Sequence, residues 1–133
     1  MKQLTLILAF LVTANAWAEW TRIGEVKIQG GRFTVYVDPA TISRTGRFAK
    51  MWGMYDFNAP KLLAGKGEYR SIKFQNEFDC SEGRFRVLSI SWYAANMSGG
   101  EPISSAKPDS KWMPASSGTS DQGLLQAACN PME

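Results

Sequence analysis

Few residues of this chain could carry out chemistry, because histidine, the commonest general base and metal ligand, is absent. A Ser-His-Asp triad, a Cys-His pair or a histidine zinc site cannot be built without it. Ser104 and Lys107 match the spacing of a serine–lysine nucleophile. The companion S-D-N and K-T-G motifs are missing, however, and the segment has the composition of a loop. We therefore predict that the protein is not an enzyme, and we expect neither a cofactor nor a metal ion.

Three aspartates, Asp38, Asp56 and Asp79, are the other candidates for chemistry. Two carboxylates on neighbouring strands could form a pair for general acid–base catalysis. Each aspartate, however, sits where the pattern predicts the end of a strand, and aspartate there commonly closes a turn through the nearby backbone. We expect turn-closing roles for all three.

Residues 1–18 have the features of a secretory signal peptide: Lys2, an apolar run from Leu4 to Val12, and Ala16-Trp17-Ala18 before the expected cleavage site. The apolar run is too short to span a bilayer, and we expect no membrane span in the processed protein. The remainder, 19–133, has the length of one domain. The predicted location is the periplasm, with the cell surface or secretion as alternatives. A formal net charge of +3 gives no reason to expect a nucleic-acid partner.

The two cysteines of the chain, Cys80 and Cys129, predict one disulfide, because an even count in an exported domain most simply means pairing. The alternative is two independent buried thiols. No CxxC spacing is present to lower a thiol pKa, which disfavours a redox-active pair.

Short alternations of apolar and polar residues dominate the chain after residue 18 and predict antiparallel strands with one buried face. Two of these strands are joined by a turn at Gly30-Gly31, and the second should end at Asp38-Pro39, since proline cannot extend a ladder. We read 58–67 as a long exposed loop and 98–118 as loop with at most one short strand. The predicted strands are 25–28, 33–37, 47–57, 69–80 and 84–93.

The strand at 84–93 carries apolar residues on both faces, which predicts a central position in the sheet. Strict alternation places Phe85, Val87 and Ser89 on one face. The same alternation places Arg86, Leu88, Ile90 and Trp92 on the other.

Thr119 and Gln122 have the spacing of a capping box and predict a helix of roughly ten residues that stops at Asn130-Pro131. Two pairs spaced four apart, Leu124 with Ala128 and Leu125 with Cys129, form its apolar stripe. A bridge from Cys129 to Cys80 would pin this helix to the sheet. The expected fold class is α+β: mainly an antiparallel sheet of five to six strands, with a C-terminal helix packed on one face and tethered by a disulfide.

Tryptophan and tyrosine are abundant for so small a domain, and most of them should lie in the core. Some could instead join basic residues of the two central strands in an exposed recognition patch. The plain alternative is a solvated strand face whose charge is balanced by Glu68, Glu77, Asp79 and Glu82. An edge strand could also pair with a second copy to make a homodimer. The candidate protein-binding patch consists of Arg70, Lys73, Arg84, Arg86 and Tyr93.

Ordered segments spread over nearly the whole chain after residue 18 carry a resemblance to a known family. They are Tyr36-Val37-Asp38 with Thr41-Ile42, then Met51-Trp52-Gly53-Met54-Tyr55-Asp56-Phe57, Phe78-Asp79-Cys80 with Arg84 and Arg86, Tyr93, Met97, Gly99-Gly100, Trp112, Pro114, Gly118-Thr119 and Cys129. In their order and spacing the chain resembles the surface-adhesin protein E family of bacterial envelope proteins. The resemblance implies an antiparallel sheet with a helix tethered by the disulfide.

The resemblance also implies adhesion, because the best-known member of the family is a surface lipoprotein that binds host proteins. A lipoprotein needs a cysteine directly after the cleavage site, whereas this chain has Ala18 followed by Glu19. We therefore expect an exported protein-binding module, adhesin-like and non-catalytic, whose partner is a host matrix or envelope protein. The alternative is a soluble periplasmic accessory protein that acts as an inhibitor or a small-ligand binder.

Overall fold

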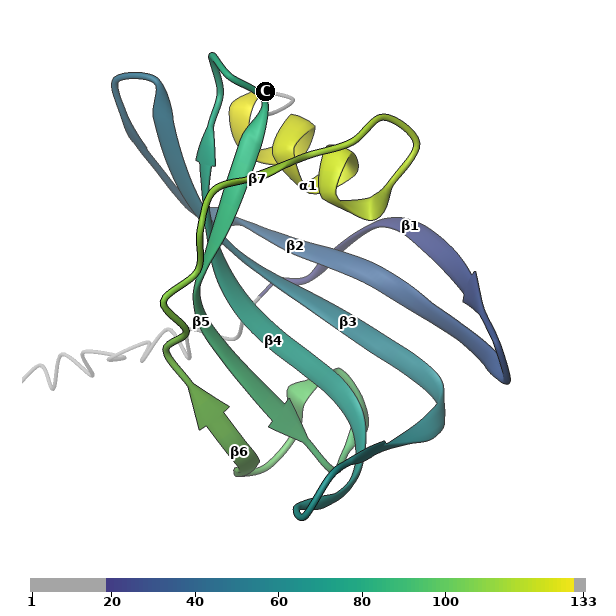
Figure 1. Cartoon of the computed structure of the whole chain (residues 1–133). Helices are drawn as coiled ribbons and strands as arrows, with labels where there is room; N and C mark the ends of the chain where they lie inside the picture. Colours follow the sequence, from purple (N-terminus) through teal and green to yellow (C-terminus); the bar gives the residue numbers. More distant parts are fainter. Residues whose placement is uncertain (1–18, 131–133) are drawn as a thin grey trace, which may run out of the picture.

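A computed structural model describes residues 19–130, so the predicted signal peptide at 1–18 lies outside the described residues. Six strands follow one another in chain order across one antiparallel sheet, and a short seventh strand pairs with β5 (Figure 1). The strands are β1 (Thr21–Ile28), β2 (Gly31–Thr45), β3 (Phe48–Leu63), β4 (Gly67–Asp79), β5 (Arg84–Tyr93), β6 (Pro102–Ala106) and β7 (Met113–Pro114).

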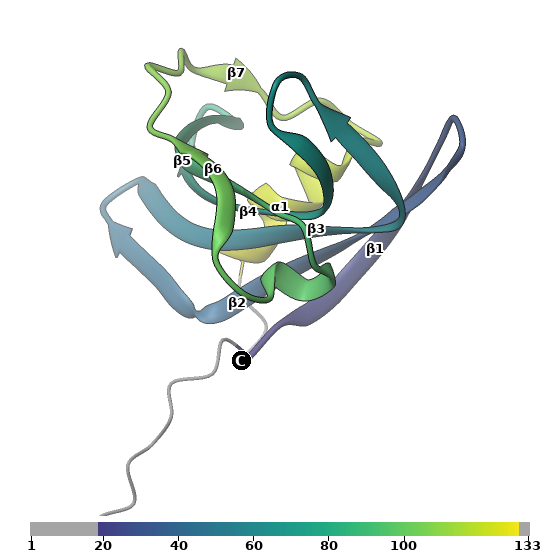
Figure 2. The same ribbon diagram turned by 90° about the horizontal axis from the view of Figure 1, so that it is seen from below.

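One α-helix, α1 (Ser120–Cys129), follows the strands, and the curved sheet wraps around it (Figure 2). The fold class expected from the sequence is confirmed, and the sheet has one strand more than the upper bound of that expectation. The central position of β5 is also confirmed, because it pairs with β4 on one side and with β6 and β7 on the other.

The N-cap of α1 is Thr119, as the sequence predicts, but the capping box is only half formed, because the Gln122 side chain binds the N–H of Gly118 rather than that of Thr119. The Thr119 side chain accepts a hydrogen bond from the Gln122 N–H, and the Gln122 side chain accepts one from the Gly118 N–H at 3.0 Å. Asp121 lies in the first turn, where the helix dipole favours a negative charge. Leu124 and Ala128 of the predicted stripe have no exposed surface, which fixes the helix on the sheet.

The first hairpin forms where Gly30-Gly31 predicts it, with Ile28 opposite Gly31 and Gly30 at a φ of 83°. The prediction that the second strand ends at Asp38-Pro39 is wrong, because β2 continues to Thr45. The ladder between β2 and β3 is interrupted between Asp38 and Ser43, so the missing N–H of Pro39 costs no ladder bond. Thr41 bridges the gap: its hydroxyl donates to the Asp38 carbonyl and accepts from the Trp52 N–H.

The long exposed loop predicted at 58–67 is also wrong. Strand β3 runs to Leu63 and β4 starts at Gly67, with Lys61 opposite Tyr69 and a tight turn closed by the Lys66 N–H on the Leu63 carbonyl. A register shift between Asp56 and Lys61 breaks the alternation here, so the sequence has no periodic signal.

The predicted faces of β5 are correct only for its first half. Asn76 pairs with Val87 and Gln75 with Ser89, so Leu88 is an extra residue in a β-bulge. After the bulge, Ile90 lies opposite Phe74 and packs against the core, on the same face as Phe85 and Val87 rather than the other. The segment 98–118 contains two short strands, β6 and β7, instead of at most one.

The core lies between the concave face of the sheet and α1. A close approach at Gly53 is part of it, because the Phe74 ring lies where a side chain at Gly53 would stand. The buried residues of the core cluster are Val35, Val37, Ala49, Met51, Phe74, Phe78, Phe85, Leu124 and Ala128.

Candidate functional site: a cation–aromatic face

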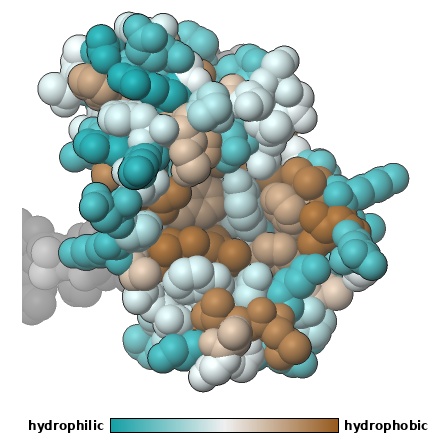
Figure 3. All heavy atoms as spheres, in the orientation of Figure 1, coloured by the Kyte–Doolittle hydropathy of each residue, from teal (hydrophilic) through white to brown (hydrophobic). Residues whose placement is uncertain are grey.

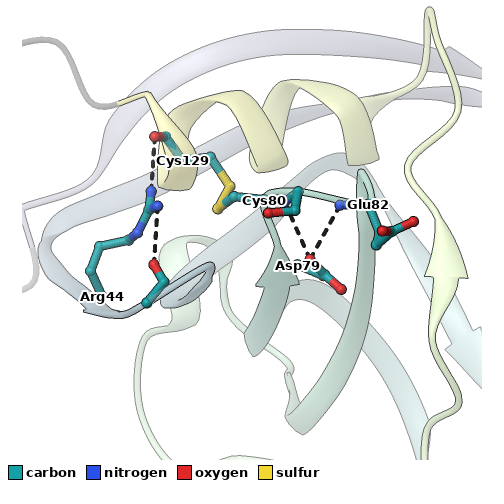
Figure 4. Close-up of a disulfide and its surroundings, with 7 residues drawn as sticks. Arg44, Asp79, Cys80, Glu82 and Cys129 are labelled. Atoms are coloured by element: carbon teal, nitrogen blue, oxygen red, sulfur yellow. Dashed lines mark hydrogen bonds between the residues drawn. A yellow bond between two sulfur atoms is a disulfide. The ribbon is translucent and has the colours of Figure 1, made fainter.

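The disulfide joins Cys80, just after β4, to Cys129 at the end of α1, with the two Cα atoms 5.7 Å apart (Figure 4). The predicted pairing is therefore confirmed. Arg44 of β2 strengthens the same junction, because its guanidinium donates to the Cys129 carbonyl at 3.0 Å and to the Gly46 carbonyl at 3.3 Å. The helix end is thus held to two different parts of the sheet.

Asp79 lies beside this junction, and its side chain has no exposed surface. One carboxylate oxygen accepts from Arg47 at 2.9 Å and Arg84 at 3.1 Å. The other accepts from the backbone N–H groups of Ser81 and Glu82. Asp79 therefore closes the turn after β4, as the sequence predicts, and also ties β4 to Arg84 of β5 and to Arg47 in the turn between β2 and β3.

The pKa of Asp79 reflects two opposed influences. Desolvation acts to raise it, but the Glu82 N–H, the Arg84 and Arg47 guanidinium groups and the Ser81 N–H together leave the pKa below its ordinary value. Asp79 is therefore a charged structural group.

The turn-closing role predicted for the other two aspartates holds for Asp38 only. It is wrong for Asp56, which lies inside β3 and binds two residues about forty positions further along the chain. Asp38 accepts from the Ala40 N–H at 3.2 Å, and Asp56 accepts from the Met97 N–H at 2.7 Å and the Asn96 amide at 3.1 Å. Within residues 19–130 no group of three or more acidic or cysteine side chains is arranged to hold a metal ion.

The side of the sheet facing away from α1 carries a group of cations and aromatic rings, the Trp112 cluster, formed by Phe48, Arg84, Arg86 and Trp112. The Trp112 ring centroid lies 5.2 Å from the Arg84 guanidinium carbon, 4.7 Å from that of Arg86 and 5.8 Å from the Phe48 ring. Arg84 and Arg86 are 39% and 40% exposed, so the cluster is accessible from solvent.

A second group on the same face, the Lys73 cluster, consists of Trp52, Lys73 and Tyr93. The Lys73 ammonium lies 5.4 Å from the Trp52 ring and 5.8 Å from the Tyr93 ring. None of the ion pairs within residues 19–130 includes Lys73. A depression of about 180 Å³ adjoins it, lined by Trp20, Asp38, Thr41, Trp52 and Lys73.

The five residues of the predicted patch are not placed alike. Lys73, Arg84, Arg86 and Tyr93 share the face away from α1, as the strand registers require. Arg70 is one residue out of phase with Lys73 and falls on the opposite face by alternation. Tyr93 is only 6% exposed, so it supports the Lys73 ammonium from beneath.

The charge on this face is partly balanced by its own acids. Arg86 pairs with Glu77 at 2.6 Å, while Arg47 and Arg84 share the single carboxylate of Asp79. The solvated-face alternative names four acids, and two of them, Glu77 and Asp79, form ion pairs with these arginines. Positive charge beyond these pairs comes from Lys73, from the second arginine on Asp79 and from Lys50, which lies opposite Glu77 in the register.

The expectation from the sequence that most tryptophans and tyrosines lie in the core is wrong, because only Tyr93 of the described ones is buried. As members of an exposed face, Trp52 and Trp112 were considered only within that general group, and Phe48 was not considered. Trp112 lies in the segment between β6 and β7, more than twenty positions along the chain from the arginines that it covers. Its one visible signal is that Lys111-Trp112-Met113 interrupts a stretch rich in glycine, serine and proline.

The fold and this face define a small, disulfide-tethered domain in which a curved antiparallel sheet holds one helix and turns a cation–aromatic surface outward. A family model described as surface-adhesin protein E matches residues 20–130. The chain therefore belongs to the surface-adhesin protein E family, as the sequence resemblance indicates.

Two crystal structures of protein E from Haemophilus influenzae are similar to this chain. One, from a non-typeable strain, has a TM-score of 0.55 and 13% identity over 82% of this chain and 77% of that one. The other, described as crystal form II, has a TM-score of 0.58 and 13% identity over 71% and 79% of the two chains. At this identity the likeness shows the fold. A sequence search of curated proteins finds no match.

Proposed function

We propose that this chain is an exported, non-catalytic module that binds a protein partner through the Trp112 and Lys73 clusters. The observation that carries the proposal is the Lys73 ammonium, which lies 5.4 Å and 5.8 Å from two aromatic rings and forms no ion pair within residues 19–130. A cation held in this way is already ordered, so a partner carboxylate can bind it at a low entropic cost.

The arrangement of the two clusters favours an elongated partner segment. Lys73 and Glu77, the cross-strand partner of Arg86, are four residues apart on β4, which is about 13 Å at the rise of an antiparallel strand. Tryptophan and arginine are the residue types that most often dominate binding energy at interfaces. An acidic segment with aromatic or aliphatic side chains between its carboxylates would match this surface.

Membership of an adhesin family supports a host matrix protein as the partner. An envelope protein of the same cell remains the alternative, with the chain acting as a periplasmic accessory protein. No helix within residues 19–130 has the length and apolar character to cross a membrane. Strands β1 and β6 lie at the two ends of the strand order. Because an edge strand can pair with another chain, a homodimer stays a prediction.

Binding assays with a matched pair of double variants test the proposal. The protein is passed over immobilised extracellular-matrix and serum proteins, and Lys73→Gln/Arg86→Gln is compared with Lys27→Gln/Lys66→Gln, which removes the same charge from exposed positions elsewhere. We expect the first variant to weaken binding at least tenfold at physiological salt and the second to leave it nearly unchanged. Equal losses would mean that only net charge matters, and the face would not be the site.

Cell fractionation with external protease distinguishes the two partner classes. Digestion of the protein on intact cells supports a host partner. Protection until the outer membrane is opened supports an envelope partner, and the same pair of variants can then be compared in capture assays from periplasmic extract.

A further inference from the structure

A hollow on the opposite side of the sheet is independent of the proposed binding face. It lies where the first turn of α1 leaves β3, β4 and β5 uncovered, and its volume is about 120 Å³. Figure 3 shows hydrophobic side chains lining a depression in this part of the molecule. Ile72, Phe74, Val87 and Ile90 form its apolar wall. We call it the α1 hollow.

Asn76 gives the α1 hollow a feature that packing alone does not explain. Asn76 lines the hollow and is 3% exposed, and its side-chain oxygen has no hydrogen-bond partner among the described residues. A buried acceptor without a donor is costly, and the great majority of such groups in proteins are paired. The wall of the hollow therefore includes a buried acceptor that lacks a donor within the described part of the chain.

Asp121 gives the same hollow a negative charge. It lines the hollow from the first turn of α1, and it takes part in none of the ion pairs within residues 19–130. Desolvation raises the pKa of its carboxyl group, which is the mark of an acid partly withdrawn from water and not compensated by a cation.

Tyr55 completes the set of groups around the hollow. Its ring packs edge-on against Phe74, with the centroids 4.8 Å apart, and its hydroxyl lies 3.4 Å from the Ser120 hydroxyl. Aromatic faces attract cations, most strongly where water is excluded. The hollow thus combines an apolar wall, the three rings of Tyr55, Phe74 and Phe85, an acceptor without a donor among the described residues and a carboxylate outside their ion pairs.

We propose that the α1 hollow binds a primary ammonium group on an unbranched alkyl stem, with the stem against Ile72 and Ile90 and the ammonium between Asn76 and Asp121. The size supports this ligand class, because drug-sized molecules occupy roughly 300–1,000 Å³ and this hollow holds only a fragment such as one long side chain. The ligand is either a free alkylamine or the lysine side chain of a polypeptide, since both present the same chemistry.

Titration with n-butylammonium chloride tests the proposal in the oxidised protein. Methyl and amide NMR spectra should show shifts at Ile72, Val87, Ile90 and the Asn76 side-chain amide, with weak affinity as expected for so small a ligand. n-Butanol, which has the same stem without the charge, should bind at least tenfold more weakly. Equal shifts from the alcohol, or no shifts at these residues from any probe, would overturn the proposal.

Two variants assign the roles of the polar groups. Asn76→Leu has nearly the same shape and removes an unpaired buried polar group, so it should fold at least as well as the wild type. Asp121→Asn removes only the charge. Each should weaken butylammonium binding about tenfold, since hydrogen bonds to charged groups are the stronger ones. Unchanged binding in Asn76→Leu would overturn the proposal and leave a bound water as the partner of that oxygen.

A pair of short peptides separates the two sources of the ammonium group. One contains a central lysine, and the matched control has norleucine at that position. Shifts at the hollow from the lysine peptide, absent with norleucine, indicate a polypeptide ligand. Shifts from butylammonium alone indicate a small amine, and both results support the same chemistry. The site lies on the other side of the sheet from Lys73 and Arg86, so the Lys73→Gln/Arg86→Gln variant should bind butylammonium normally even if the proposed protein-binding function fails.

Discussion

Removing the disulfide should cost this domain a large part of its stability without detaching α1. Cys80 and Cys129 are 49 residues apart in the sequence, and closing a loop of that length lowers the entropy of the unfolded chain by an amount worth about 4 kcal/mol. A whole domain is typically stable by only about 5–15 kcal/mol. The double variant Cys80→Ala/Cys129→Ala should therefore be folded at room temperature, with only a small free energy of unfolding left.

The assay is unfolding in guanidinium chloride, followed by tryptophan fluorescence. With a slope of roughly 3–4 kcal/mol per molar denaturant, the expected loss lowers the unfolding midpoint by about 1 M. Reductant supplies the control, because it should lower the midpoint of the wild type and leave that of the double variant unchanged.

The folded double variant should keep α1 on the sheet, because Leu124 and Ala128 remain fully buried and Arg44 still binds the Cys129 backbone carbonyl. Methyl NMR signals of Leu124 report this directly. A loss of stability below about 1 kcal/mol, or a folded variant in which Leu124 is no longer packed, would refute the reasoning. The bridge would then act mainly on the folded state rather than on the unfolded chain.

Three further predictions concern the core and the buried carboxylate. Gly53→Ala should destabilise the domain by about 1–3 kcal/mol in denaturant unfolding, because the new methyl group would stand 2.6 Å from a Phe74 ring carbon. Leu124→Ala, at a residue with no exposed surface, should cost about 2–5 kcal/mol, whereas Leu62→Ala, at 79% exposure, should change stability by less than about 0.5 kcal/mol. Asp79→Asn should be less stable than the wild type at neutral pH. Since the folded pKa of Asp79 is lower than the unfolded one, this stabilisation is complete above the unfolded pKa and disappears as the pH falls through the folded value, so unfolding curves of the two proteins should converge in strong acid.

Each of these predictions has a result that would count against it. A glycine variant as stable as the wild type would mean that the Phe74 ring moves freely. Equal costs at the two leucines would contradict the position of the core. A stability difference between Asp79→Asn and the wild type that stays constant on acidification would show that Asp79 does not stabilise the fold through its charge.

The sequence predicted the features that are set by neighbouring residues or by the compartment. Gly30-Gly31 specifies a turn because glycine accepts a positive φ, and Thr119 specifies a helix start because its side chain accepts a hydrogen bond from the N–H of Gln122 in the first turn. The disulfide followed from an even cysteine count in a chain that looks exported.

The errors occurred where the register of a strand changes. Pro39 falls inside such an irregularity, and Leu88 is a bulged residue that reverses the alternation after it. Period-two reasoning cannot detect an extra residue, since the side chains on either side of it look normal.

The candidate sites were harder to predict because they depend on long-range contacts. Trp112 meets Arg84 and Arg86 only after the chain has passed through β6 and returned along β5. The unpaired state of the Asn76 oxygen depends on which groups the fold leaves out of reach, and no local pattern encodes it.

Every consecutive pair of strands from β1–β2 to β5–β6 contains a register shift. Such irregularities bend and twist strands, and here the bent sheet encloses a helix (Figure 2). The curvature is therefore encoded in the number of residues per strand rather than in their chemistry. A relative without the residue that corresponds to Leu88 would keep Ile90 and Tyr93 on their present faces, yet its flatter sheet would enclose a different volume. Insertions and deletions within strands are thus a way for this architecture to change what it binds while the contacting side chains stay the same.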